Sequence, residues 1–193
     1  MKRSVLLFAA LLLLTSCAAG QADTRVETLQ QKYAALSGCD ARVAVTVACD
    51  GETRQYTLDI AKEGDETRVT VLEPETLAGV GAVVSGDALS LAYDGMVLDA
   101  GSADERVSAV NAADILLRAA ASGYVTERNT ERYEDTDALR LCFETEQGGE
   151  TLRVTAWFDA ADRPLYAELE RGGEVLAYLE FTDFVFHDII PAE

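Results

Sequence analysis

The chain has 193 residues, 49% of them apolar, and it carries 34 acidic against 16 basic side chains, a formal charge of −18. This length fits a single domain, and the apolar fraction is large enough to build a core. The acidic surplus argues against nucleic acid as a ligand, because such binding needs a basic face, and against charge-driven docking on anionic lipid head groups. We expect a solvated acidic surface, for which a protein partner would be basic.

The N-terminus has the pattern of a secretory signal peptide. Lys2 and Arg3 precede a ten-residue apolar run over 5–14, which is too short to span a bilayer as a helix. The run leads into Leu14-Thr15-Ser16-Cys17, which resembles the lipobox of bacterial lipoproteins. That resemblance implies cleavage before Cys17, a diacylglycerol on its thiol, and acylation of the new N-terminus, for example with palmitate. The alternative is an ordinary signal peptide followed by a chance cysteine.

We therefore predict a signal peptide over 1–16, a lipidated Cys17 with a short tether over 17–22, and one domain over 23–193. Cleavage removes Lys2 and Arg3 and takes the charge from −18 to −20. The tether reaches only about 12 Å as a flexible coil, and two acyl chains hold a protein stably on a membrane. The domain would thus stay close to the extracytoplasmic face of the cell membrane, so diffusion across a periplasm is not expected.

Two helices are predicted in the domain. The first starts at Asp23 or Thr24, repeats apolar residues at helical spacing and ends at Gly38. The second follows Asn111, which can cap it, and stops at Gly123. Both helices have one apolar side that must be buried against another element.

The remaining segments alternate apolar and polar side chains, as β-strands with one buried face do. Strands are predicted over 43–49, 55–60, 67–72, 89–93, 96–98, 139–144, 152–158, 165–170 and 175–181. Short turns such as Asp50-Gly51 connect them, so we expect one antiparallel meander. About eight to ten strands make a sheet about 40 Å wide. A sheet of this width tends to curl, and two helices cover roughly half of it. The apolar side is then either a packed core or an apolar pocket.

Three motifs carry a family resemblance: Leu72-Glu73-Pro74-Glu75-Thr76-Leu77-Ala78-Gly79-Val80, Trp157-Phe158-Asp159 with Arg163-Pro164-Leu165, and Phe181-Thr182-Asp183-Phe184. With the lipobox and the order of elements, the chain resembles the LolA-like lipoprotein carrier superfamily. Within it, the chain is similar in kind to membrane-anchored lipoproteins of spore-forming Firmicutes such as the germination lipoprotein GerS. The resemblance implies a mainly β (α+β) fold, an unclosed antiparallel half-barrel whose concave apolar face is covered by two helices.

The resemblance implies two alternative functions. Carrier members hold acyl chains on the concave face, so a lipid or another apolar ligand would bind in a pocket there. The residues expected to line this pocket are Tyr56, Leu58, Leu91, Leu141, Phe143, Val154 and Phe158. The germination member is instead a protein partner of an enzyme that processes the cell wall, so the second alternative is a scaffold that recruits or activates a cell-wall (spore cortex) enzyme.

The segment from Leu77 to Val84 combines apolar residues with two glycines that loosen the backbone. It is either a mobile apolar lid over the pocket or a buried connection and strand of the core. The candidate lid residues are Leu77, Val80, Val83 and Val84.

No residue set predicts an enzyme, a metal site or a cofactor. Beyond Cys17 the cysteines are Cys39, Cys49 and Cys142, and we predict no structural disulfide, with a bridge from Cys39 to Cys142 as the least excluded pairing. The single histidine, His187, lies near two aspartates and is expected to be a surface residue.

Overall fold

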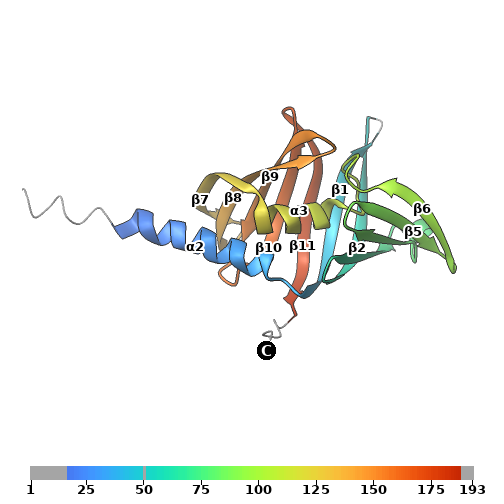
Figure 1. Ribbon diagram of the computed structural model, residues 1–193, viewed down its shortest axis with the longest axis horizontal. Helices are drawn as coiled ribbons and strands as arrows, with labels where there is room; N and C mark the ends of the chain where they lie inside the picture. Colours follow the sequence, from blue (N-terminus) through green and yellow to red (C-terminus); the bar gives the residue numbers. More distant parts are fainter. Residues whose placement is uncertain (1–16, 50, 188–193) are drawn as a thin grey trace, which may run out of the picture.

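The computed structural model describes residues 17–49 and 51–187, so the predicted signal peptide over 1–16 lies outside the described residues. Figure 1 shows one broad curved sheet with helices on one side. The helices are α2 (Cys17–Ala34), α3 (Ala112–Ser122) and the short 3-10 helix η1 (Glu75–Leu77). The strands are β1 (Gly38–Cys49), β2 (Glu52–Glu63), β3 (Glu66–Glu73), β4 (Gly81–Ser85), β5 (Ala88–Tyr93), β6 (Met96–Ser102), β7 (Tyr124–Tyr133), β8 (Thr136–Gln147), β9 (Glu150–Phe158), β10 (Pro164–Arg171) and β11 (Glu174–Phe186).

The eleven strands follow the order β6-β5-β4-β3-β2-β1-β11-β10-β9-β8-β7 across the sheet. Hairpins build two antiparallel meanders, and the pairing of β1 with β11 joins one to the other. In the described part of the chain, β6 and β7 are the two edges of the sheet and do not pair with each other. The sheet is therefore unclosed, which confirms the predicted mainly β half-barrel with two covering α-helices.

The core lies on the concave side, where apolar side chains of the central strands meet both α-helices. Leu29 and Tyr33 of α2 are buried there, as are eight residues of α3. The ring of Phe158 meets those of Tyr33 and Phe143 edge to face, with centroids 5.7 and 6.4 Å apart. Burial of each such side chain contributes about 1.5–3 kcal/mol, so one continuous cluster holds the helices on the sheet.

The first helix is longer than predicted, because α2 begins at Cys17 and includes the residues expected to form a flexible tether. Three of the five residues over 18–22 are alanines, the strongest helix formers, so the helix continues toward the N-terminus. No helix among the described residues combines the length and the apolar character needed to cross a membrane. The position of α3 is confirmed, since it lies between Asn111 and Gly123.

One strand, β7, was not predicted from the sequence, and β4 was predicted only as one of two alternatives for the segment from Leu77 to Val84. β7 is an edge strand with both faces largely exposed, so its sequence YVTERNTERY lacks the alternation of a half-buried strand. β4 has the short sequence GAVVS, in which small residues hide the alternation. It pairs with β3 and β5 on its two sides and is an internal strand.

Candidate functional site

The middle of the concave face is a packed core, one of the two alternatives that the sequence left open. Of the seven residues predicted to line a pocket, five have no exposed area: Leu58, Leu141, Phe143, Val154 and Phe158. The other two, Tyr56 and Leu91, are partly buried against the same cluster. The five fully buried residues do not line an open pocket in the described structure, because the apolar side chains of the sheet and of the two helices meet in one packed cluster.

Burial decreases toward the β6 end of the sheet. One row of paired residues crosses five strands and consists of Ile60, Val69, Ala82, Leu91 and Leu98. Paired residues share a face of the sheet, so all five point to the concave side. Ile60, Val69 and Ala82 are at most 3% exposed, Leu91 is half-buried, and Leu98 is 64% exposed. The two helices lie over the part of the sheet formed by β7–β11 and β1 and do not extend over β5 and β6 (Figure 1).

The uncovered end carries a group of large exposed apolar side chains, which we call the apolar wing: Tyr93, Met96, Val97 and Leu98. Their exposed fractions are 56, 61, 70 and 64%. Tyr93 pairs with Met96 and Leu91 with Leu98, so Tyr93, Met96 and Leu98 share the concave face while Val97 lies on the convex face. Large apolar groups gathered on a surface mark interaction sites, which makes the apolar wing the candidate functional site.

Strands were predicted at the apolar wing, but the exposure of its side chains was not. Met96, Val97 and Leu98 are three consecutive apolar residues, whereas a strand with one buried face alternates. Such a run indicates a strand that is apolar on both faces. The sequence does not show whether such a strand is buried or lies at an edge of the sheet, as β6 does.

A tight turn holds β5 and β6 together at the tip of the wing. Asp94 and Gly95 form the two-residue loop and both have positive φ, 48° and 76°. This backbone matches the twist of a hairpin and is favoured by the Asp-Gly pair. The hairpin therefore presents its apolar residues on a defined backbone, with Tyr93 and Met96 directly beside the turn.

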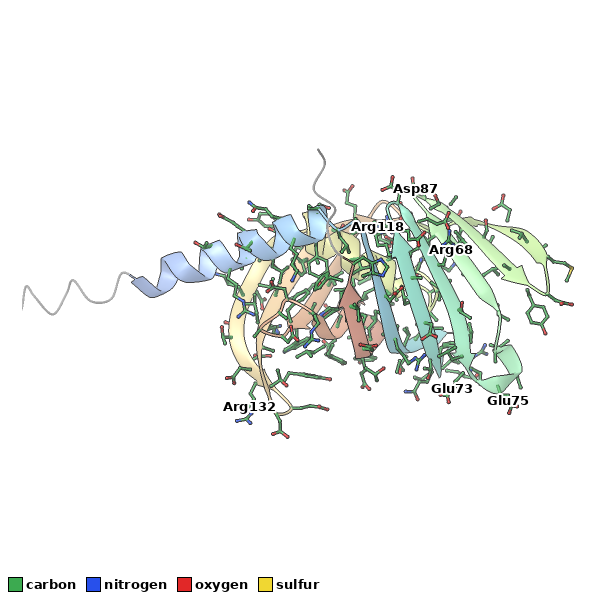
Figure 2. The ribbon with its side chains drawn as sticks, turned by 90° about the horizontal axis from the view of Figure 1, so that it is seen from below. Arg68, Glu73, Glu75, Asp87, Arg118 and Arg132 are labelled. Carbon is green, nitrogen blue, oxygen red and sulfur yellow. The ribbon has the colours of Figure 1, made fainter. Side chains whose placement is uncertain are left out.

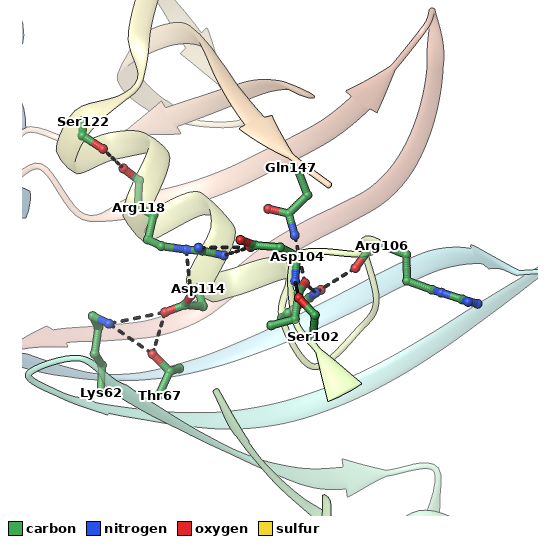
Figure 3. A network of polar contacts seen from close by, with 11 residues as sticks. Lys62, Thr67, Ser102, Asp104, Arg106, Asp114, Arg118, Ser122 and Gln147 are labelled. Atoms are coloured by element: carbon green, nitrogen blue, oxygen red, sulfur yellow. Dashed lines mark hydrogen bonds and ion pairs between the residues drawn. The ribbon is translucent and has the colours of Figure 1, made fainter. Parts of the chain in front are cut away.

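Hydrogen bonds attach the other end of β6 to the centre of the molecule, as Figure 3 shows. Ala103 follows β6, and its carbonyl accepts bonds from the side chains of Asn111 at 2.6 Å and Gln147 at 2.9 Å. The next residue, Asp104, pairs with Arg118 of α3 at 3.3 Å. Asn111 is committed to this loop, so its side chain makes no capping bond to α3.

A buried carboxylate fastens α3 to the sheet beside this loop. Asp114 accepts a hydrogen bond from Thr67 at 2.7 Å and pairs with Lys62 at 3.3 Å and Arg118 at 3.0 Å. The Asp114 side chain is 4% exposed and that of Lys62 is 13% exposed. Removing one member of such a buried set leaves the others unpaired and is costly. The wing is thus joined at its base to a rigid polar network that extends to α3 (Figure 3).

The charged side chains in the segment around the apolar wing are all acidic. Residues 69–105 contain seven Asp and Glu side chains and no Lys, Arg or His. Asp94 and Asp99 lie directly beside the apolar residues of β6. At its base, a hydrogen bond with Asp104 raises the pKa of the Asp87 carboxyl, and the negative charge of Asp104 adds to this shift. Asp87, labelled in Figure 2, lies in the turn between β4 and β5.

Two of the four predicted lid residues, Val83 and Val84, belong to the sheet. Val84 lies in β4 and is 1% exposed, while Val80 and Val83 are partly buried. Leu77, in η1, is 40% exposed. The interpretation as a buried connection and strand therefore holds for β4, since an internal strand bonded on both sides cannot act as a mobile lid. The two glycines of this segment do not loosen its backbone, because they lie beside β4 or at its first residue, where the strand ladder fixes the backbone.

The remaining predicted residues have structural roles. Cys39 and Cys142 are both free and buried, so they do not form the bridge that was left open. Burial raises the pKa of the Cys39 thiol to about 12, which keeps it protonated and unreactive. His187 bonds to Asp40 at 2.9 Å. Among the described residues no group of three or more His, Cys, Asp or Glu could hold a metal.

Open cavities occur at the margins of the sheet. One of about 520 Å³ lies between α2 and β7, and one of about 670 Å³ lies beside Tyr56 and Pro74. Tyr56 is the only predicted pocket residue that lines either of these two cavities. Both are bordered by charged side chains, Glu27 and Glu127 in the first and Glu73 and Glu75 in the second.

Comparisons with known proteins extend the description of the fold. No family model matches the sequence, and no curated protein matches it. The fold is similar to that of an uncharacterized conserved protein from Thermus thermophilus, with a TM-score of 0.50 and 14% identity over 86% of this chain and 88% of that chain. It is also similar to a putative outer membrane lipoprotein-sorting protein domain from Vibrio parahaemolyticus, with a TM-score of 0.48 and 14% identity over 90% and 93%.

A third similar structure is a LolA superfamily protein from Nitrosomonas europaea, with a TM-score of 0.46 and 14% identity over 86% of this chain and 94% of that chain. At these identities the likeness concerns the fold alone. The narrower resemblance to germination lipoproteins stays a prediction. The chain has an unclosed, helix-covered half-barrel, and the solved structures similar to it include LolA superfamily proteins.

Proposed function

We propose that this chain is an extracytoplasmic lipoprotein, anchored through Cys17, that binds a lipid or another apolar ligand at the apolar wing and has no catalytic role. The observation that supports this most directly is the exposure of Tyr93, Met96 and Leu98 on one face, at 56, 61 and 64%. Covering such side chains with acyl chains is favourable by about 25 cal/mol for each Å² of apolar surface removed from water. The carboxylates around the wing favour a neutral or cationic ligand.

The ligand proposal is tested by native mass spectrometry of detergent-free protein. Wild-type protein should carry a lipid adduct. The double variant Met96→Ser/Leu98→Ser should lose this adduct, because the two substitutions remove exposed apolar area without disturbing the core. Tyr124→Ser is the matched control, since Tyr124 is also exposed, at 74%, but lies on β7 at the opposite edge. Equal adducts on all three proteins, or none on the wild type, would refute the wing as a ligand site.

The anchor proposal has its own test. A Cys17→Ser protein should be released from the membrane fraction, because the thiol that carries the diacylglycerol is lost. A protein that stays bound to the membrane after this substitution would contradict the anchor.

A second candidate function is a scaffold that recruits or activates a cell-wall enzyme. The filled core supports this alternative, because five of the seven residues predicted to hold a ligand are used to hold the helices. Membrane-bound protein should then increase the activity of a purified wall amidase, and the Cys17→Ser form should not localise that activity. An unchanged amidase rate with saturating protein would argue against this function.

A further inference from the structure

We propose that the free edge of β6 accepts an extended, basic segment of a protein partner as an additional antiparallel strand. This inference rests on the second proposed function, recruitment of a protein, and names the surface and the chemistry of the partner. It does not depend on lipid binding at the concave face of the wing.

In the described structure, the backbone of β6 has unpaired hydrogen-bonding groups on its outer side. Among the described residues β6 pairs only with β5, so its outer side is an open edge. Tyr93 and Met96 flank a two-residue turn and form a hydrogen-bonded pair in such hairpins. Hydrogen-bonded and non-hydrogen-bonded pairs then alternate, which turns the N–H and C=O groups of Val97 and Asp99 away from β5. These groups are available to a further strand.

The side chains beside that edge are apolar on both faces of β6. Met96 and Leu98 lie on one face of β6 and Val97 lies on the other, and all three are more than 60% exposed. An exposed edge with apolar residues on both faces is the type of strand that natural proteins otherwise blunt with charges, because it readily pairs with another chain. A partner strand would cover apolar surface on both faces at once.

The charge around the edge of β6 favours a basic partner segment. Residues 69–105 supply seven carboxylates and no basic side chain, and Asp94 and Asp99 flank the apolar residues of β6. A second copy of the chain would bring the same carboxylates to the edge, and an anionic bilayer would also be repelled. An extended segment that alternates apolar with Lys or Arg side chains satisfies the backbone, the apolar residues and the charge together.

The experiment uses the domain over 17–193 in its folded form and a labelled peptide of about ten residues, a usual strand length, that alternates valine and lysine. Amide exchange should show new protection at Val97 and Asp99 when the peptide is added, because their N–H groups become bonded. Binding should weaken as salt is raised. An otherwise identical valine–glutamate peptide should bind at least about tenfold more weakly, since it meets like charges.

Val97→Pro is the diagnostic variant, because proline removes an N–H that points to solvent and is tolerated at such edge positions. This substitution should weaken binding of the valine–lysine peptide by about tenfold. Thr130→Pro is the matched control: Tyr133 and Thr136 flank the β7–β8 turn, so Thr130 has the same outward position on β7. That variant should bind as the wild type does.

Four results would overturn the proposal: equal binding of both peptides, equal loss in both proline variants, unchanged exchange at Val97 and Asp99, or a dimer in sedimentation that Val97→Pro dissociates. Binding of anionic vesicles that Val97→Pro abolishes would likewise assign the edge to a lipid surface. The lipid adduct distinguishes the proposed lipid ligand from the proposed strand partner, because the adduct should persist in Val97→Pro whereas peptide binding should weaken. An adduct without peptide binding would refute only the strand partner, and peptide binding without an adduct would refute only the lipid ligand.

Discussion

The two edge strands of the sheet differ in their side chains: β7 is rich in charged residues, whereas β6 begins with three apolar residues. β7 carries Glu127, Arg128, Glu131 and Arg132, and Glu127 pairs with arginines of the neighbouring strands at 3.2 and 2.6 Å. These pairs lower the pKa of Glu127 and keep it charged. β6 instead presents Met96, Val97 and Leu98 to solvent. The charges on β7 disfavour addition of a further strand there, whereas β6 carries a single charged residue, so β6 is the edge where we expect binding.

The concave face shows the same division along a single row of residues. Ile60 and Val69 are buried in the core cluster, whereas Leu98 at the β6 end is open. Position in the fold decides this, because side chains of similar character occupy both regions. Substitutions in the two regions should therefore differ strongly in their effect on stability.

The largest effect is expected for Phe158→Ala. Phe158 is fully buried and packs edge to face with Tyr33 and Phe143, so its truncation should lower the free energy of unfolding by about 3–5 kcal/mol. Leu98→Ala on the open wing should change it by less than about 0.5 kcal/mol. Denaturant unfolding followed by circular dichroism measures both. Similar losses in the two variants would mean that the wing is packed against the core.

An intermediate effect is expected for Asp114→Ala, which tests how the covered region is fastened. The substitution leaves Lys62 without its buried partner and removes the acceptor of Thr67, so we expect a loss of about 3 kcal/mol. Amides of α3 and of the loop after β6 should also exchange faster. Asp59→Ala is the control: Asp59 pairs with Arg42 at 2.8 Å on the exposed side of the sheet, where we expect little change.

The smallest effect concerns the base of the wing and depends on pH. The hydrogen bond with Asp104 raises the pKa of Asp87 in the folded state. The proton is thus held more tightly by the folded protein, so stability contributed by this pair is present below the ordinary carboxyl pKa, about 3.9, and is lost as pH rises through the folded pKa.

Asp87→Asn keeps a hydrogen-bond donor toward Asp104 at every pH. It should therefore raise the melting temperature slightly at pH 7 and leave it unchanged near pH 3.5. Thermal unfolding followed at several pH values measures the difference. A variant that is less stable than the wild type at neutral pH would contradict the proposed carboxyl pair.

Most of the fold could be predicted, because its signals are local. Alternation in segments such as 152–158 identifies strands with one buried face, and Asn111 and Gly123 mark the ends of α3. β7 was missed because an edge strand has no buried face to produce alternation. The extension of α2 to Cys17 was missed because a tether and an alanine-rich helix are both compatible with the composition over 18–22.

The antiparallel hairpins, the two helices, the acidic charge and a motif that resembles a lipobox and ends at Cys17 follow from the sequence, since each depends on residue types and their spacing along the chain. Which apolar side chains are covered follows from the three-dimensional arrangement. Val154 and Leu98 both belong to apolar strands, yet one is fully buried and the other is 64% exposed. Burial depends on how far α2 and α3 reach across the sheet and on which strands become its edges, and both are consequences of strand order rather than of any local pattern.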